Sequence, residues 1–136
     1  MLHTIQSSAA DREAAALRAM FAARKAVFVD LLKWDVPVLA GRFEIDQFDD
    51  RHATYLVLTD GDGGHLASAR LLPTTRPHLL TDMFAHLCAY APPRDSAIYE
   101  ITRFCLDRRL DARARRAARD TLVTALVEQG LAHGIT

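Results

Sequence analysis

Apolar residues recur three or four positions apart along the first quarter of the chain. From about Ala10 to Leu32 this spacing is typical of an amphipathic helix whose apolar side faces a core. Arg24 falls on that side, one helical turn from both Met20 and Phe28. Because an unpaired guanidinium is costly to bury, we expect an acidic partner for Arg24. The apolar side comprises Leu17, Met20, Phe21, Val27, Phe28, Leu31 and Leu32.

The pattern then changes from helical spacing to short apolar runs. Segment 31–50, broken by Pro37 and Gly41, is predicted to be a long loop. Residues 53–59 are rich in strand formers and are followed by a turn of aspartates and glycines, after which a second strand begins at His65. This hairpin predicts that Arg70 points out from one face of its second strand.

The second half of the chain is predicted to contain a short helix, a strand and a long helix. The helix covers 79–87, the strand 97–107 and the long helix about 111–132. The last three residues, 134–136, resemble the start of one more strand. We expect the apolar side of the long helix to include Ala117, Leu122, Val123, Leu126 and Val127.

Composition limits the classes of protein to consider. Half of the 136 residues are apolar, and 17 basic side chains balance 17 acidic ones. The length favours a single domain over 1–136, and the balanced charge argues against nucleic acid as a partner. No long apolar run is present, so we expect no signal peptide, no membrane insertion and a cytoplasmic location. Cys88 and Cys105 lack metal-ligand spacing and are predicted to be buried free thiols.

Four acidic residues stand close together in EIDQFDD, residues 44–50. They are Glu44, Asp46, Asp49 and Asp50. Such a cluster repels itself unless cations lie nearby. Taken alone, a solvated acidic loop explains it best, and a calcium loop fits poorly because the DxDxDG spacing is missing.

The hexapeptide YEITRF carries Glu100 and Arg103 inside an apolar strand. Residues three apart face opposite sides of a regular strand, so both can line one cleft only if the strand is bulged or splayed. An ion pair with another element would explain this hexapeptide equally well. Together with Arg24, Arg70 and the acidic segment, however, these charges predict one buried cluster, for which a functional site is the more economical explanation.

Two further features have ordinary explanations as well as functional ones. Trp34 in a loop is usually a hydrophobic plug, although its ring would also suit a cation such as a sulfonium. The segment 108–119 is rich in arginine, for which a solvated helix face is the default. Positive charge near a helix N-terminus opposes the helix dipole, so docking of a phosphate or an acidic protein is the alternative. The arginines are Arg108, Arg109, Arg113, Arg115, Arg116 and Arg119.

In order, the segments FAARKAVFVDLLKWDVPV, EIDQFDD, SARLLPTTRP and YEITRFCLD resemble the signature blocks of the acyl-homoserine-lactone synthases. The resemblance spans residues 20–107, and the combination of blocks is far more specific than any one of them. The positions that match the characteristic residues of that family are Arg24, Phe28, Trp34, Asp46, Asp49, Arg70, Phe84, Glu100 and Arg103.

The resemblance implies an α/β fold related to the GNAT acyltransferases, an α/β/α sandwich with a twisted, mostly antiparallel sheet flanked by helices. It implies an acyl carrier protein as donor, S-adenosylmethionine as second substrate, and neither cofactor nor metal. The amine of S-adenosylmethionine takes the acyl group, and lactone formation releases methylthioadenosine for quorum sensing. Family members continue further, so the resemblance implies that the C-terminal part of this fold is missing.

The resemblance also implies roles for individual residues. Glu100 is expected to act as the base that frees the amine, with Asp46, Asp49 and Arg103 as the other catalytic residues. The arginine-rich segment would dock the acidic carrier protein. Substrate binding is expected from Arg24, Phe28, Trp34, Arg70, Phe84 and Thr102.

Two other functions stay open. A GNAT-type N-acetyltransferase holds the pyrophosphate of coenzyme A in a glycine-bearing loop between a strand and the next helix. Here that junction, Leu106 to Asp111, contains no glycine, which argues against this function. The second is a non-catalytic remnant that binds S-adenosylmethionine or carrier protein without turnover.

Overall fold

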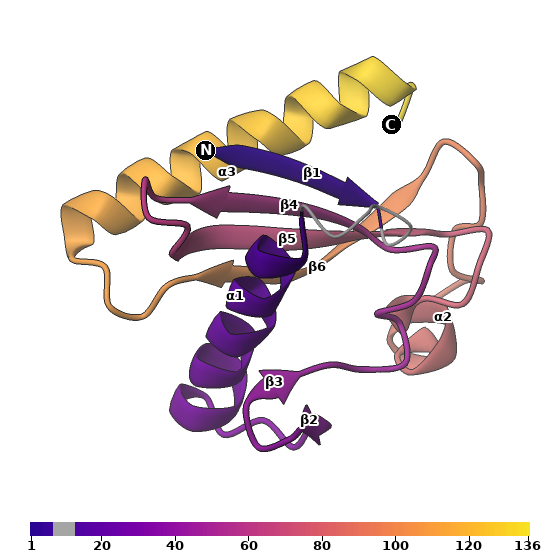
Figure 1. Ribbon diagram of the computed structural model, residues 1–136. Coiled ribbons are helices and arrows are strands. Elements are labelled where there is room, and N and C mark those ends of the chain that lie inside the picture. Colours follow the sequence, from indigo (N-terminus) through magenta and orange to yellow (C-terminus); the bar gives the residue numbers. More distant parts are fainter. Residues whose placement is uncertain (7–12) are drawn as a thin grey trace.

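The computed structural model describes residues 1–6 and 13–136 and contains a four-stranded antiparallel sheet (Figure 1). The strand order is β1-β4-β5-β6. The predicted hairpin is confirmed as β4 and β5, since both strands lie where the apolar runs placed them. The bounds are β1 Leu2–Gln6, β4 Thr54–Thr59, β5 His65–Pro73 and β6 Tyr99–Leu106.

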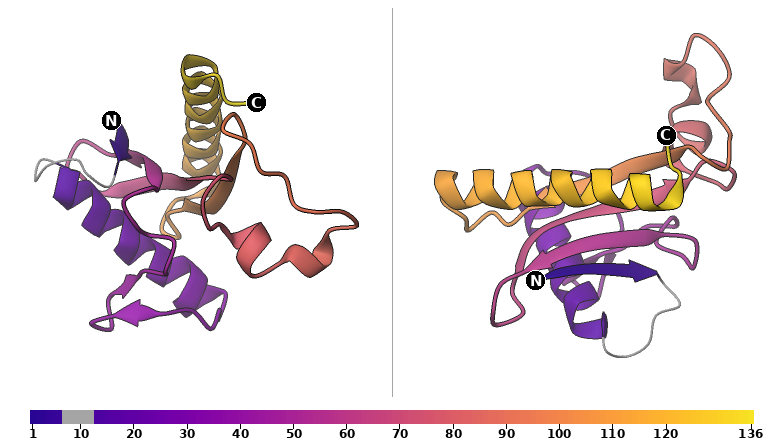
Figure 2. Two further views of the ribbon diagram at one scale, coloured as in Figure 1. Left: turned by 90° about the vertical axis from the view of Figure 1, so that its right-hand side faces the viewer. Right: turned by 90° about the horizontal axis from the view of Figure 1, so that it is seen from above.

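Two long helices cover opposite faces of the sheet (Figure 2). On one face, α1 (Ala14–Arg24) packs Ala16 and Met20 against Ile5, Tyr55 and other strand residues. On the other face, α3 (Ala112–His133) packs against the side chains that point the opposite way, such as Leu56 on β4. The alternation of Tyr55 and Leu56 thus divides the core into two layers. The predicted α/β/α sandwich is confirmed.

The first predicted helix is only partly as expected. Its expected residues 10–12 lie outside the described part of the chain, and α1 begins at Ala14. After Arg24 the helix widens into a π-helical segment, Lys25–Leu31. Leu31 and Leu32 were predicted to face the core, but both are about half exposed. The wider turn changes the helical spacing, so a pattern based on 3.6 residues per turn no longer identifies the buried side.

The last helix was placed correctly, but its buried side was predicted only in part, since Leu122 is buried and Leu126 packs against the core. The residues that face the sheet are Ala118, Leu122 and Ala125. Ala117, Val123 and Val127 are exposed. Two of these three buried residues are alanines, whose small side chains let the helix lie close to the strands. A prediction based on hydropathy alone favours larger apolar residues for the buried side.

The end of the chain does not form the predicted strand. Gly134 adopts a left-handed conformation with φ of 64° and ends α3. Ile135 then donates its N–H to Gly130 O at 2.9 Å, and Thr136 donates to Ala97 O at 2.7 Å. These residues close the helix instead of extending the sheet.

Several short elements fill the remaining segments. The segment expected to be a loop contains a small ribbon, and the strand β1 at the sheet edge was not predicted at all. The expected short helix is present as two separate turns. The bounds are β2 Val38–Leu39, β3 Phe43–Glu44, α2 Leu79–Asp82 and a 3-10 turn Ala85–Leu87. In the described part of the chain, no helix is both long and apolar enough to cross a membrane.

A β-bulge interrupts the pairing of β5 with β6 at Arg103. Ser68 pairs with Cys105 and Arg70 pairs with Thr102, so two residues of β6 stand opposite the single Ala69 of β5. Arg103 has a φ of 51°, a conformation that a residue with a side chain rarely adopts. The bulge that Glu100 and Arg103 would need in order to line one cleft is therefore present in β6.

The two cysteines differ from each other. Cys105 is buried, as predicted, and burial raises the pKa of its thiol to about 12. Cys88 is only half buried. Both thiols are free.

Candidate active site

Six charged side chains form one network between α1, the sheet and segment 44–49. We call this network the charged cluster. It contains three acids and three arginines, so its formal charges cancel. Its members are Arg24, Glu44, Asp46, Asp49, Arg70 and Arg103.

Arg24, at the end of α1, is the innermost cation. It binds Glu44 through Nε at 3.1 Å and Nη2 at 2.8 Å, and it binds both carboxylate oxygens of Asp49 at 2.8 Å. All three side chains are fully buried. Burial lowers the pKa of Arg24, but the two acids outweigh that effect and raise it. Burial raises the pKa of Asp49, but Arg24 and Arg70 hold it well below its usual value. The predicted acidic partner of Arg24 is confirmed.

Arg70 connects the sheet to the acidic segment. Its Nε donates to Thr102 Oγ1 at 2.9 Å, and its Nη1 and Nη2 donate to the two oxygens of Asp46 at 2.6 and 3.1 Å. Nη1 also lies 3.0 Å from Asp49 Oδ1. Every polar group of this buried arginine therefore faces an oxygen, as burial of a guanidinium requires.

Arg103 joins the charged cluster to two aromatic rings. Its Nε donates to Glu44 at 2.6 Å and its Nη2 to Asp46 at 2.8 Å. The bulge makes this possible because it turns Arg103 to the same side as its neighbour Thr102. Phe28 and Trp34 stack with centroids 4.6 Å apart, and the guanidinium carbon lies 5.7 and 5.6 Å from these two rings.

The acids of the charged cluster lie close enough together to bind a metal ion, but their negative charges are already neutralised. Oxygens of Glu44, Asp46 and Asp49 lie within 4.8 Å of one another. Each carboxylate, however, is already paired with two of the arginines. The arginines supply the positive charge that a cation would otherwise provide.

A pocket of about 560 Å³ opens beside the charged cluster. Asp46, Arg103 and Thr102 contribute polar groups to its wall, whereas Arg24, Glu44, Asp49 and Arg70 do not line it. The pocket therefore presents one guanidinium, from Arg103, and two carboxylates, from Asp46 and Asp35, beside apolar and aromatic walls. The remaining lining residues are Trp34, Val36, Pro37, Gln47, Phe48, Leu79, Met83 and Phe84.

Glu100 does not join the charged cluster. Its Oε1 and Oε2 accept the backbone N–H groups of Leu79 and Leu80 at 3.1 and 2.9 Å. The glutamate thus holds the start of α2, and Leu79 in turn lines the pocket. The expectation that Glu100 converges with the other five predicted charges in one network is therefore wrong for this residue. Asp50 also lies outside the cluster, since it is exposed and accepts the His52 N–H.

The arginine-rich segment lies away from the pocket, around the start of α3. Arg109 is paired with Asp107 and Arg119 with Asp120. Arg108 and Arg115 donate to the backbone oxygens of Ala26 and Asp107. In the described part of the chain, this leaves Arg113 and Arg116, both exposed on α3, with no partner for their guanidinium groups.

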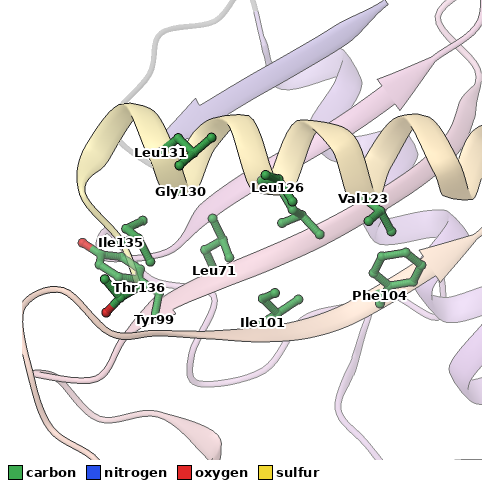
Figure 3. Close-up of a pocket in the computed structure, with 11 residues that line it drawn as sticks. Leu71, Tyr99, Ile101, Phe104, Val123, Leu126, Gly130, Leu131, Ile135 and Thr136 are labelled. Atoms are coloured by element: carbon green, nitrogen blue, oxygen red, sulfur yellow. The ribbon is translucent and has the colours of Figure 1, made fainter.

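A second, apolar groove of about 500 Å³ runs between β6 and α3 (Figure 3). Ile101 and Phe104 from the strand face Val123 and Leu126 from the helix across it. The far edge of β6 has no partner strand in residues 1–6 and 13–136. The bulge explains the arrangement, since Thr102 and Arg103 point to the charged cluster while their neighbours on either side point to this groove.

Two side chains of the site were not singled out from the sequence. Glu44 was seen only as part of an acidic segment, yet it is fully buried and binds both Arg24 and Arg103. Tyr55 on β4 donates its hydroxyl to Asp49 at 2.8 Å. The alternation of β4 places Tyr55 on the α1 side, but only the tertiary structure shows that Asp49 lies there.

Comparison with known proteins gives one consistent result. A family model described as autoinducer synthase matches residues 8–134. An acyl-homoserine-lactone synthase of Ralstonia nicotianae is 42% identical over 106 residues, which cover 76% of this chain and 52% of that protein. The chain thus spans about half the length of this relative.

Solved structures agree with the sequence matches. The CoA-dependent acyl-homoserine lactone synthase BjaI, solved with SAM and isopentyl-CoA, is 31% identical with a TM-score of 0.86. The match covers 99% of this chain and 63% of BjaI. TofI, solved with an inhibitor and MTA, is 30% identical with a TM-score of 0.80, covering 99% of this chain and 68% of TofI.

Proposed function

Because the chain belongs to the autoinducer synthase family, we propose that it carries the S-adenosylmethionine site of an acyl-homoserine-lactone synthase that acts in the cytoplasm. The reaction is an acyl transfer without a cofactor. The amine of S-adenosylmethionine attacks the thioester carbonyl, a thiol leaves, and an amide forms. The substrate carboxylate then attacks its own γ-carbon, the C–S bond to the sulfonium breaks, and methylthioadenosine is released with the lactone.

The pocket beside the charged cluster is the observation that carries this proposal. S-adenosylmethionine has an ammonium, a carboxylate, and a sulfonium that is attached to adenosine, whose adenine is a flat aromatic ring. Asp46 suits the ammonium and Arg103 suits the carboxylate. Trp34 and Phe84 offer ring faces to the sulfonium and the adenine.

The remaining members of the charged cluster act behind this surface. Glu44 holds Arg103, while Asp49 and Arg70 hold Asp46, and Arg24 binds both Glu44 and Asp49. None of these four lines the pocket. Phe28 stacks on Trp34 and so fixes one wall. Thr102 accepts the Nε hydrogen of Arg70 and lines the pocket itself.

We propose Glu100 as the base, acting from the edge of the pocket. Its two oxygens each accept one backbone N–H, and a carboxylate oxygen has a second lone pair for a proton or a bridging water. The position next to Leu79 supports access to the pocket from the α2 side. Exchanging Glu100 for Gln keeps the size and removes the basicity, but it also replaces one acceptor of a backbone N–H by an NH2 group. Lost turnover with unchanged S-adenosylmethionine affinity in this variant would therefore support the role as base, whereas equal loss of binding would assign Glu100 to holding α2.

We propose an acyl carrier protein as donor instead of free coenzyme A. The N-terminus of α3 is capped by its own Asp111, whose carboxylate accepts the Ala114 N–H at 2.8 Å. The guanidinium of Arg109 is bound by Asp107. A pyrophosphate would have to displace these acids, whereas the exposed Arg113 and Arg116 suit an acidic protein surface.

The apolar groove between β6 and α3 is where we place the acyl chain. Its walls are aliphatic and aromatic, and only strand β6 separates it from the pocket. The thioester would then meet the amine at the edge of that strand. A remnant that binds S-adenosylmethionine without turnover is the second candidate, because both oxygens of Glu100 already accept backbone N–H groups.

The test has two stages. Calorimetric titration should show S-adenosylmethionine binding by the wild-type protein, and its absence would refute the proposed site. Incubation with S-adenosylmethionine and acyl carrier protein loaded with an acyl chain should then give lactone, and binding without lactone would favour the remnant. The Glu100→Gln variant should lose at least about a hundredfold in turnover. Glu128→Gln, a change at an exposed position on α3, should turn over like the wild type.

A further inference from the structure

Tyr55 occupies the boundary between the apolar core and the charged cluster. The residue lies on β4 and is 2% exposed. Its ring meets Phe21 edge-on at 5.9 Å, and its hydroxyl donates to Asp49 Oδ1 at 2.8 Å. Its partner across the hairpin is Arg70, which contacts the same Asp49 oxygen. Two neighbouring strands therefore aim one neutral and one charged donor at a single atom.

Asp49 transmits this contact to the pocket. Its Oδ2 accepts the backbone N–H of Asp46 at 2.8 Å, and its own N–H donates to Asp46 O at 3.1 Å. These two bonds close a turn over residues 46–49. Asp49 does not line the pocket, whereas Asp46 does. Any change in the position of the Asp49 carboxylate thus shifts the backbone from which the Asp46 carboxylate reaches the ligand.

We propose that Tyr55 is a positioning residue for the S-adenosylmethionine site, an inference that rests on the proposed function. Its hydroxyl fixes Asp49, Asp49 fixes the turn, and the turn sets Asp46 against the substrate amine. Tyr55 therefore affects the binding of the amine end of S-adenosylmethionine, which the charged cluster orients, and not the binding of the adenosine.

A neutral donor is what this position requires. Arg24 already donates a hydrogen bond to Asp49 Oδ1, and Arg70 forms an ion pair with the same oxygen. A further cation would upset the balance of three acids and three arginines, whereas a hydroxyl restrains the carboxylate without adding charge. Without it, the Asp49 carboxylate is held by the Asp46 N–H and by arginines that also serve Glu44 and Asp46.

Two ligands separate positioning from general loosening of the fold. S-adenosylmethionine carries the ammonium and carboxylate, while methylthioadenosine lacks both and keeps the adenosine and sulfur. Tyr55→Phe removes one oxygen and keeps the ring that packs on Phe21. Calorimetry should show S-adenosylmethionine binding about tenfold more weakly to this variant, the scale of one hydrogen bond to a charged group. The Kd for methylthioadenosine should stay within about twofold of wild type.

The controls decide among the outcomes. Tyr90→Phe makes the same chemical change at a residue that is 89% exposed, and it should bind both ligands like the wild type. Equal S-adenosylmethionine affinity in Tyr55→Phe and wild type would overturn the inference, as would equal weakening of both ligands. A wild-type protein that binds neither ligand would instead refute the proposed function on which the inference rests.

A double-mutant cycle gives a second, independent measurement. If Tyr55 acts through Asp46, then adding Tyr55→Phe to Asp46→Asn should weaken S-adenosylmethionine binding by less than about twofold. A full tenfold loss in that background would show that the two residues act separately and would overturn the proposed route.

Discussion

His65 makes the stability of this protein sensitive to mild acid. The residue opens β5 and is 3% exposed. Its Nε2 lies 2.8 Å from Ser68 Oγ, while Nδ1 has no hydrogen-bond partner in the described part of the chain. Burial lowers the pKa of His65 from 6.5 to about 4; the nearby Asp107 opposes this effect and Arg109 adds to it. The folded protein therefore holds His65 neutral at a pH where the unfolded chain protonates it.

The sign and size of the effect follow from that difference. Because the unfolded state binds the proton more readily, the stability is complete above pH 6.5 and falls as the pH drops from 6.5 to 4. Each unit of pKa difference corresponds to about 1.4 kcal/mol, so the full loss is about 3 kcal/mol. That is a large share of the roughly 5–15 kcal/mol that stabilises a typical domain.

Urea unfolding at several pH values between 7.5 and 4.5 measures this loss. His65→Gln is the matched variant, since its amide can still meet Ser68 but does not titrate. Wild type should lose about 2 to 3 kcal/mol more than the variant over this range. Buried carboxylates such as Asp49, whose pKa is lowered, act only at more acid pH. Parallel curves for the two proteins, or an NMR titration of His65 near pH 6.5, would refute the reasoning.

Two further substitutions test the charged cluster and the core by chemical denaturation. Glu44→Gln leaves Arg24 and Arg103 short of a buried counter-charge and should cost about 3–5 kcal/mol, so a loss below about 1 kcal/mol would contradict the cluster's part in folding. Leu122→Ala opens a cavity between α3 and the sheet and should cost about 2–5 kcal/mol, whereas Val123→Ala, at a residue 45% exposed, should cost much less. Equal costs for the two would mean that α3 is oriented differently.

The sequence predicted most of the charged cluster, and it predicted the details of the fold less well. Charges at unfavourable positions are conspicuous in a sequence: Arg24 on an apolar side needed an acid, and the spacing of Glu100 and Arg103 needed a bulge. Both requirements are met. The same argument failed for Glu100 itself, because backbone N–H groups of α2 satisfied its carboxylate. Backbone donors are present at every residue, so a sequence does not show which of them an acid will meet.

The structural features that the sequence analysis missed have no distinctive pattern of apolar and polar residues. β1 is five residues long and only Ile5 is buried, so its alternation is too short to register. The π-helical segment 25–31 depends on its packing, since its residues also suit an α-helix. The buried side of α3 contains alanines whose small size allows close packing against the sheet. In each case the tertiary contacts determine the conformation, because the local sequence is compatible with more than one.

The balance of charges in the cluster has a consequence for how this protein tolerates mutation. Replacing any one of the six side chains by a neutral one leaves an opposite charge unpaired in the interior. Selection for folding alone would therefore conserve all six positions. Four of the six touch no ligand pocket. Arg24, Asp49 and Arg70, three of the nine positions that match the family's characteristic residues, therefore support the fold, and they would persist even in a family member without catalytic activity.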